Sequence, residues 1–479
     1  MPALPPSAAE DPVSAGWPEQ LLLACALSVL IAAVLRAEPL QSANDRSRWC
    51  TVWSLVERGT WQIDEIDQVR RFSTIDKVRH RTSDQEPWHF YSSKPPLLST
   101  MVAGLYWVQR QTIGLGLFAH TAVVTRLLLL PINLLPMGLA LLSLRRTLVL
   151  LRASPTSRLF VLATAGFGSM ANPWLTTLNN HTPAVVCAVF FLSALIRILT
   201  AESAMMPARP RDFALMGFFS ALCSCFELPA ALLGAIAFIL AARRNLRLTL
   251  RWFLPAAALP LTAFFVTNWI CTGGLKPFYA YYGTDKYIYV HEGIPSYWSQ
   301  PRGLDASRET LPVYLFHCTL GHHGILSLSP VLLLTLTGWL SLLRRPGASS
   351  DASSDASLTA PELRPEVLRP VLWLGVILTA ATLGFYLSRT QNYNYGGNSA
   401  ALRWMLWLSP FWWLALLPSI ERIRLRRRFL SAALLLLVAS SISAGWSQNR
   451  PWRPPWLFEV LQQAGWIDYS APAQQRQQR

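Results

Sequence analysis

Charged side chains are scarce in this sequence: Asp, Glu, Lys and Arg make up 14% of its 479 residues, compared with about 25% in ordinary soluble domains. This scarcity excludes a chain that consists mainly of soluble globular domains. Apolar residues make up 52% of the sequence and occur in long runs, and a helix needs roughly 20 apolar residues to span a membrane. The composition therefore predicts an integral membrane protein.

Acidic residues are the scarcer of the two charges, with 26 Asp and Glu against 42 Lys and Arg and a net charge of +16. A nucleic-acid-binding protein would carry such an excess as a stripe on a soluble fold. Here the arginines lie in short clusters between apolar runs, as in the cytoplasmic loops of membrane proteins. We therefore expect no nucleic-acid partner and a cytoplasmic amino terminus. This orientation keeps in the cytoplasm Arg145, Arg146, Arg243, Arg244, Arg344, Arg345, Arg426, Arg427 and Arg428.

Three functional patterns are missing. The seven cysteines have neither metal-ligand spacing nor that of a disulfide framework, which leaves open a bridge between Cys271 and Cys318. Gly114-Leu115-Gly116 is too short to be a nucleotide-binding motif. The first apolar run is followed by no convincing cleavage site, so we interpret it as an anchor. The sequence thus gives no sign of a nucleotide-borne substrate.

The apolar runs predict an all-α membrane protein with about 11 transmembrane helices. The runs are 18–35, 119–143, 158–177, 182–199, 212–226, 228–242, 252–270, 324–343, 370–388, 400–419 and 429–445. We interpret residues 1–445 as one polytopic membrane domain.

With the amino terminus in the cytoplasm, three segments face outward. These are the first outer loop (36–118), a second long loop (271–323) and the tail 446–479. The segment 346–369 is rich in Ser and Asp, which predicts a disordered cytoplasmic linker.

The first outer loop contains two predicted amphipathic helices. Residues 44–58 form the first, with Asn44 as N-cap and Gly59 as its end. The second begins at Pro95-Pro96, since proline is tolerated in a first helical turn. The second helix is too short to span and too apolar for water, so we expect it to lie in the membrane interface, with the amphipathic first helix beside it.

Asp45 and Lys94 lie at the starts of these two helices. A carboxylate in a first helical turn can accept a proton, and a lysine beside free backbone donors can bind an anion. The alternative is structural: Asp45 would cap its helix, and Lys94 would extend to the interface without contacting a substrate.

The first loop also resembles that of a known enzyme superfamily. The residues Asn44-Asp45-Arg46-Ser47-Arg48, Gly59-Thr60 and Tyr91-Ser92-Ser93-Lys94-Pro95-Pro96-Leu97 are similar to those of GT-C glycosyltransferases. The most similar branch contains the protein O-mannosyltransferases and the lipid A aminoarabinose transferases. The resemblance is specific over residues 17–145; after residue 145 only the predicted membrane topology is similar.

The resemblance implies an inverting transfer of a sugar from a polyprenyl-phosphate donor to a lipid, glycan or protein acceptor at the outer face of the membrane. Asp45 would match the acidic catalytic residue and Lys94 the residue that steadies the donor phosphate. Asn44 replaces the first carboxylate of the usual acidic pair, so no metal ligand is assigned, and a requirement for a divalent cation stays open. The branch and the arginine-rich loops favour the bacterial inner membrane.

Further polar candidates lie on the predicted outer face. Arg126 and Arg403 are candidates for binding the donor phosphate, or else arginines that extend to the interface. Asn44, Tyr91, His181 and Glu227 are candidates for substrate binding; Glu227 splits the run 212–242, either as two short helices beside a wet cavity or as a surface turn. Asn180 is expected to cap the helix after it.

Two other functions remain. A membrane transporter would also keep ionisable residues within the membrane, but near its middle and in paired halves. A ligase or polymerase of lipid-linked glycans would use a similar outer face. The glycosyltransferase is favoured by the first-loop residues and by the gathering of polar candidates at one face.

Overall fold

The computed structural model describes residues 16–343, 363–390 and 394–470. Most of the linker predicted over residues 346–369 lies outside the described residues. For its last residues the prediction is wrong, because helix α16 (Pro365–Leu387) begins there. Pro365 occupies the first turn of α16, where its missing N–H costs no hydrogen bond.

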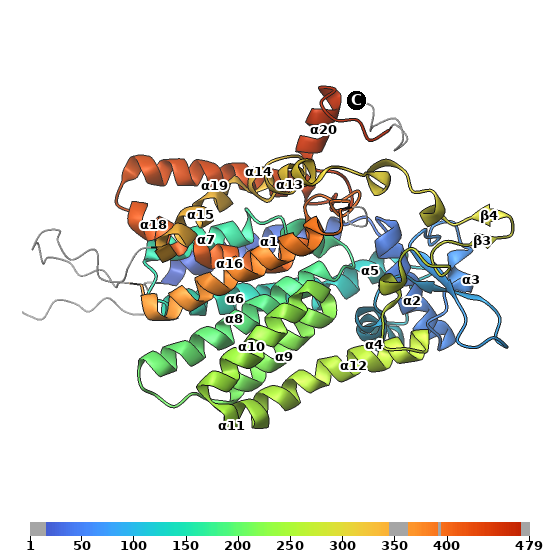
Figure 1. Ribbon diagram of the computed structural model, residues 1–479, viewed down its shortest axis with the longest axis horizontal. Helices are drawn as coiled ribbons and strands as arrows, with labels where there is room; N and C mark the ends of the chain where they lie inside the picture. Colours follow the sequence, from blue (N-terminus) through green and yellow to red (C-terminus); the bar gives the residue numbers. More distant parts are fainter. Residues whose placement is uncertain (1–15, 344–362, 391–393, 471–479) are drawn as a thin grey trace, which may run out of the picture.

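Six helical segments in the described part of the chain are long and apolar enough to cross a membrane. They are α1 (Trp17–Arg36), α5 to α6 (Thr121–Leu129, η2 Leu130–Leu134, Leu135–Leu150), α8 (His181–Ser203), α11 to α12 (Leu246–Leu248, η5 Thr249–Phe253, Leu254–Thr272), α16 and α19 (Arg427–Ser447). Most of them run along the long axis of the molecule (Figure 1). The chain is an α-helical multi-pass membrane protein.

The count of eleven spans is not confirmed, because the other five apolar runs form shorter helices. These are α7 (Pro155–Gly166) with η3 (Asn172–Thr176), α9 (Pro210–Phe226), η4 (Leu228–Ala230) with α10 (Ala231–Arg244), α14 (Ile325–Leu328) with η9 (Pro330–Leu332), α15 (Leu333–Leu340) and η10 (Ser341–Leu343), and η11 (Arg403–Leu408) with α17 (Ser409–Ala415) and α18 (Leu417–Ile423). In the run 400–419 the protein itself covers the apolar residues, since 405–417 are all buried. Apolar residues are selected by burial in protein as well as by burial in lipid, so an apolar run alone does not show that a segment spans the membrane.

Helix α8 forms the centre of the molecule. In its apolar window 83% of the residues are buried, against 33% in α1 and 28% in α19. It packs against α6, α9, α16 and η11. The outer helices keep apolar side chains exposed, including Leu21, Leu259 and Leu435, as expected for surfaces that face lipid. The residues at the start of α8 are therefore held by packing on all sides.

The first loop contains both predicted helices and a hairpin that was not predicted. Its elements are α2 (Ala43–Arg58), α3 (Asp64–Asp67), β1 (Lys77–His80), β2 (His89–Ser92) and α4 (Pro96–Ile113). Gly59 ends α2 in the left-handed conformation at φ 68°, as predicted. The N-cap is Ser42 and not Asn44, because the Ser42 hydroxyl accepts the backbone N–H of Asp45 at 3.1 Å. Strands β1 and β2 are antiparallel and pair Lys77 with Ser92.

The second loop folds onto the first. It contains η6 (Phe278–Tyr281), β3 (Val290–His291), β4 (Ile294–Pro295), η7 (Tyr297–Ser299), η8 (Gly303–Ala306) and α13 (Leu311–Thr319), and α20 (Trp456–Gln463) follows α19. Trp298 donates to the carbonyl of Ile75 at 3.1 Å. Cys271 and Cys318 are both free, so they form no bridge. Figure 1 shows α2, α3 and the β3–β4 hairpin together at one end of the molecule.

Candidate functional site

Asp45 joins the start of α2 to the segment that precedes α8. Its Oδ2 accepts a hydrogen bond from the backbone N–H of Gln41 at 2.9 Å, and its Oδ1 accepts one from the N–H of Leu178 at 3.0 Å. The side chain is buried. Burial raises the pKa of Asp45 to about 6, although both hydrogen bonds favour its ionised form.

Glu227 connects two arginines through one hydrogen-bonded network. It lies buried at the break between α9 and α10, so it is not in a surface turn and two helices do end near it. Its Oε1 accepts hydrogen bonds from Asn180 Nδ2 at 2.7 Å and from His181 Nδ1. Asn180 Oδ1 accepts from Arg48 at 2.5 Å, and Arg403 donates to His181 Nε2 at 3.1 Å. One carboxylate thereby orients two guanidinium groups.

The partners of His181 fix its tautomer. Arginine can only donate hydrogen bonds, so the Nε2 that faces Arg403 must be the unprotonated acceptor. The proton then lies on Nδ1 and is donated to Glu227. His181 is therefore occupied on both nitrogens by protein groups.

The two asparagines do not cap their helices with their side chains. Asn180 occupies the N-cap position of α8, but its side chain bonds to Arg48 and Glu227 instead. The neighbouring Asn179 accepts the backbone N–H of Thr182 at 2.9 Å. Asn44 accepts a hydrogen bond from Arg48. The prediction for Asn44 was wrong, because Ser42 caps α2, whereas Asn180 does occupy the predicted N-cap position of α8 while its side chain bonds to other segments.

Lys94 forms an ion pair with a carboxylate that was not singled out from the sequence. Its Nζ lies 3.2 Å from Asp76 Oδ2. The register of β1 with β2 brings them together, since Asp76 precedes β1 and Ser93 follows β2, and the N–H of Ser93 donates to the carbonyl of Asp76 at 3.1 Å. The anion site expected at Lys94 is therefore already next to a negative charge.

Arg48, Lys94 and Arg403 form a group of three cations that repel one another. Burial lowers the pKa of Lys94 to about 8; Asp76 opposes this shift, while Arg48 and Arg403 add to it. Burial also lowers the pKa of Arg48 to about 10, with a further contribution from Arg403. Mutual repulsion of this kind is relieved when an anion binds between the cations.

Asp305 adds a carboxylate from the second loop. It interacts electrostatically with Asp76, Arg403 and Lys94, and its Oδ2 accepts a hydrogen bond from Tyr297 at 2.8 Å. Burial raises the pKa of Asp305. The site is therefore built from the first loop, the second long loop and the segment before α17.

Two of the predicted site residues lie apart from this network. Arg126 donates through Nε to the carbonyl of Ala37 at 2.9 Å, where it holds the end of α1. Tyr91 packs against Phe278 and His80, and its hydroxyl faces Gln62 at 3.4 Å. The structure records no contact that joins either residue to the three cations within the described ranges.

The sequence argument missed Arg48, Asp76 and Asp305 as site residues. Arg48 lies on the buried face of α2, and its spacing of three from Asp45 was a usable signal, since residues three apart share a helix face. Asp76 and Asp305 lie in irregular segments, where sequence spacing carries no such information.

A row of buried polar rings lies behind the loop that carries Arg403. His323 Nε2 donates to the carbonyl of Ser399 at 2.9 Å, and the Nδ1 atoms of His322 and His323 lie 2.5 Å apart. His322 Nε2 lies 2.9 Å from the hydroxyl of Tyr469. This row fixes the loop before Arg403 against the segment after α20.

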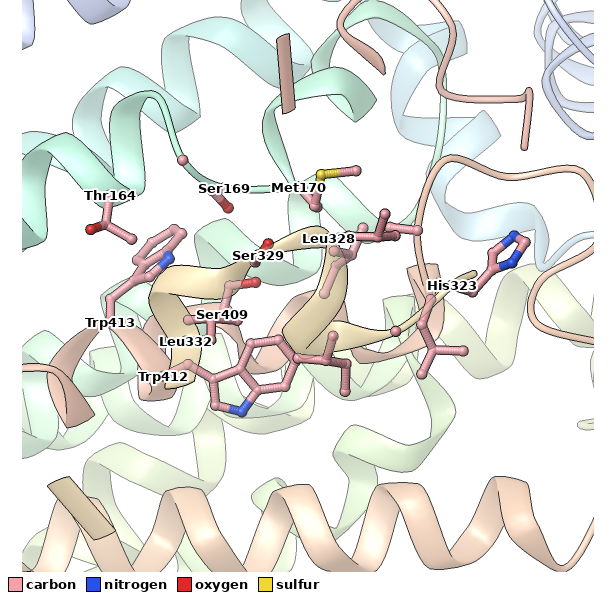
Figure 2. Close-up of a pocket in the computed structure, with 16 residues that line it drawn as sticks. Thr164, Ser169, Met170, His323, Leu328, Ser329, Leu332, Ser409, Trp412 and Trp413 are labelled. Atoms are coloured by element: carbon pink, nitrogen blue, oxygen red, sulfur yellow. The ribbon is translucent and has the colours of Figure 1, made fainter. Parts of the chain in front are cut away.

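An apolar pocket begins next to Arg403. Figure 2 shows it between the end of α7, the α14–η9 segment and α17. Its cavity volume is about 30 Å³, and Ala401, Leu402, Leu328, Leu332 and Trp412 are among its lining residues. Ser169, Ser329 and Ser409 add hydroxyls. The pocket is therefore small and mainly apolar, with room for little more than a water molecule.

Comparison with known proteins gives little further information. No family model and no curated protein matches the chain. Among solved structures, the chain is similar to the oligosaccharyltransferase of Archaeoglobus fulgidus in its apo form, with 13% sequence identity and a TM-score of 0.42. The match covers 92% of this chain and 57% of that one. A likeness at this level carries no argument about function, so the residues must supply it.

Proposed function

We propose that the protein is a GT-C-type glycosyltransferase that uses a sugar donor linked to a polyprenyl phosphate. The observation that carries the proposal is the group of three cations, the buried Arg48 and the partly buried Lys94 and Arg403, each held by hydrogen bonds or an ion pair. Together they suit a phosphate group. The first-loop resemblance to GT-C enzymes supports the same assignment.

The proposed reaction breaks the bond between the sugar and the donor phosphate. The acceptor attacks the anomeric carbon from the opposite side, which inverts its configuration, and the electron pair of the broken bond goes to the phosphate oxygen. The three cations stabilise the negative charge that develops there. Since Asn44, His181 and Glu227 bond mainly to protein groups, their proposed contribution to substrate binding is to orient Arg48 and Arg403.

A carboxylate of the first loop would accept the proton of the acceptor. The resemblance gives this role to Asp45, whose pKa is raised by burial to about 6. A base with a pKa near the working pH exchanges protons efficiently. The described residues offer no group of three or more His, Cys, Asp or Glu that could hold a metal ion, so no step is assigned to a divalent cation.

In this proposal the first loop faces the outer side of the bacterial inner membrane, and the acceptor is a lipid, glycan or protein that reaches the site from that side. The charges lie at one end of the helices, which favours transfer over transport.

The decisive experiment measures the release of free polyprenyl phosphate from a panel of polyprenyl-phosphate sugars by purified protein in liposomes, with a mixed acceptor extract. We expect release by the wild type and its loss in Arg403→Ala. Arg389→Ala is the matched control, because Arg389 lies after α16 and packs over Phe385. Release by neither wild type nor control, with folding verified, would contradict the proposal and favour transport or glycan ligation.

A further inference from the structure

The hydrogen bonds of Asp45 show that its carboxylate holds two backbone segments together. Each of its two oxygens accepts a backbone N–H, from Gln41 and from Leu178. The residue is 1% exposed. A general base must come within hydrogen-bond distance of the proton that it removes. With 1% of the residue exposed and a backbone N–H already on each oxygen, an acceptor could reach Asp45 only if the segments that bury it moved apart.

Asp76 is held by its backbone, which leaves its carboxylate available. Its N–H donates to Thr74 Oγ1 at 3.0 Å. Its carbonyl accepts the hydroxyl of Ser47 at 2.6 Å and the N–H of Ser93 at 3.1 Å. These contacts come from α2 and from both sides of the hairpin, so the position of the residue is fixed without use of its carboxylate.

The carboxylate of Asp76 faces the cations. Within the described ranges, its recorded side-chain contact is the one with Lys94 at 3.2 Å, and 11% of its side chain remains exposed. It also interacts electrostatically with Arg403 and Arg48. Asp76 therefore lies beside the cations that would bind the donor phosphate, with part of its carboxylate exposed. Asp45 is more deeply buried.

We propose that Asp76, rather than Asp45, is the catalytic base, and that Asp45 is a positioning residue. This inference rests on the proposed function. Asp76 takes the proton of the acceptor hydroxyl as the acceptor oxygen bonds to the anomeric carbon. The bond from that carbon to the phosphate oxygen breaks, and the phosphate leaves with the electron pair beside Lys94. Before the donor binds, Asp76 holds Lys94; the phosphate then replaces it as the partner of that lysine.

Azide distinguishes a catalytic base from a residue that only positions its neighbours, because it restores activity only where a base has been removed. Azide is a nucleophile that carries no proton to remove, so it can attack the anomeric carbon without a base. The experiment measures the release of polyprenyl phosphate by wild type, Asp76→Ala, Asp45→Ala and Asp84→Ala, each with and without sodium azide. Asp84 is the control, because it is a first-loop carboxylate with a side chain that is 95% exposed.

We expect Asp76→Ala to lose about 100-fold or more of acceptor-dependent turnover and to regain release with azide, with formation of a glycosyl azide of inverted configuration. Asp45→Ala should regain nothing, and Asp84→Ala should match the wild type. Asp76→Asn should bind the donor at least as tightly as the wild type, since a negative charge beside the phosphate has been removed. This binding measurement also shows that the site is still folded.

Three results would overturn the inference. Turnover in Asp76→Asn close to that of the wild type would remove Asp76 from the chemistry. The lack of azide rescue in an Asp76→Ala protein that still binds donor would make it a residue that holds Lys94. Azide rescue of Asp45→Ala alone would return the role of base to Asp45. The absence of release by the wild type from every donor would instead contradict the proposed function itself.

Discussion

Glu227 controls two cations at once, because its Oε1 is shared by Asn180 and His181. Replacing Glu227 by Ala removes the acceptor of the His181 Nδ1–H, which costs about 1–3 kcal/mol, and leaves Asn180 Nδ2 with the carbonyl of Phe226 alone. We expect both guanidinium groups to lose their orientation and the affinity for the donor to fall about tenfold or more. Donor binding to purified protein measures this.

The conservative variant Glu227→Gln tests whether geometry or charge matters. Glutamine keeps the oxygen that both donors use, so its donor affinity should be closer to that of the wild type. Glu202→Ala serves as a control, since Glu202 pairs with Arg244 on an exposed surface. Equal losses in the Gln and Ala variants would mean that the charge, and not the hydrogen bonds, sets the site.

Lys94 makes donor binding dependent on pH. Burial lowers its pKa to about 8, and a lysine carries its positive charge below its pKa. In the free protein the charge is therefore present at neutral pH and is lost as the pH rises through about 8, so donor affinity should fall over that range. Lys94→Arg keeps its charge throughout, and any donor affinity that it retains should be flat with pH. An identical pH profile in both proteins would assign the titration to another group.

The hydrogen bonds of Asp45 predict that Asp45→Asn is not neutral for stability. An amide nitrogen only donates, so one of the two backbone N–H groups that Asp45 now satisfies would lose its acceptor. We expect a loss of about 1–3 kcal/mol in the free energy of unfolding, visible as a lower Tm in detergent. Asp84→Asn should leave Tm unchanged. A loss of activity in Asp45→Asn must therefore be interpreted together with its stability.

The ends of the first-loop helices can be tested separately from the site. Gly59 ends α2 at φ 68°, and a methyl group added to it would have no other atom within 4 Å, so Gly59→Ala meets no clash and only strains the backbone. We expect a loss of about 1–2 kcal/mol in stability. Gly104 lies within α4 and also has open space; Gly104→Ala should gain up to about 1 kcal/mol. Thermal unfolding of both variants should show shifts of opposite sign.

The helices of the first loop could be predicted because their ends carry strong local signals. Gly59 and the Pro95-Pro96 pair mark an end and a start that depend on the chain alone. Strands β1 and β2 have four residues each, which is too short to show an alternating pattern. Their pairing depends on the second loop, which packs against β1 through the N–H of Arg79 and the carbonyl of Lys286. Local sequence could not reveal this contact.

For the predicted site residues, too, local sequence signals could be used but long-range contacts could not. Asp45, Lys94, His181, Glu227 and Arg403 could be selected because each is polar beside an apolar run. Which of them meet could not be predicted, since the contacts join segments that are far apart in the sequence. The same limit applies to Asn180, which occupies the predicted N-cap position of α8 but whose side chain bonds to the distant Arg48 and Glu227.

At the scale of the whole molecule, α8 predicts which segments lie on opposite sides of the membrane. It is long enough to span, and His181 and Ser203 lie at its two ends. A cysteine placed at Asp84 in the first loop should react with an impermeant maleimide from outside intact cells. One placed at Glu202, with a side chain that is 60% exposed, should react only after the membrane is permeabilised.

The reversed labelling pattern would place the first loop in the cytoplasm and contradict the proposed outer face. Labelling of both positions from the same side would contradict the crossing by α8. Reaction of the seven native cysteines is the background to subtract, and of these Cys25 alone is exposed. Hydropathy could predict α8, but not that it lies at the centre, because its apolar residues look the same facing protein or lipid.

The network around Glu227 also sets an order of assembly during synthesis. Arg48 is made before Asn180 and Glu227, and Arg403 is made only after a further 176 residues, as the positions 227 and 403 show. Glu227 can therefore be connected to Arg48 through Asn180 early, whereas the bond from Arg403 to His181 must form later, between segments already inserted. The carboxylate that organises the finished site would first orient a single arginine through Asn180, and the network would be complete only after residue 403 has been synthesised.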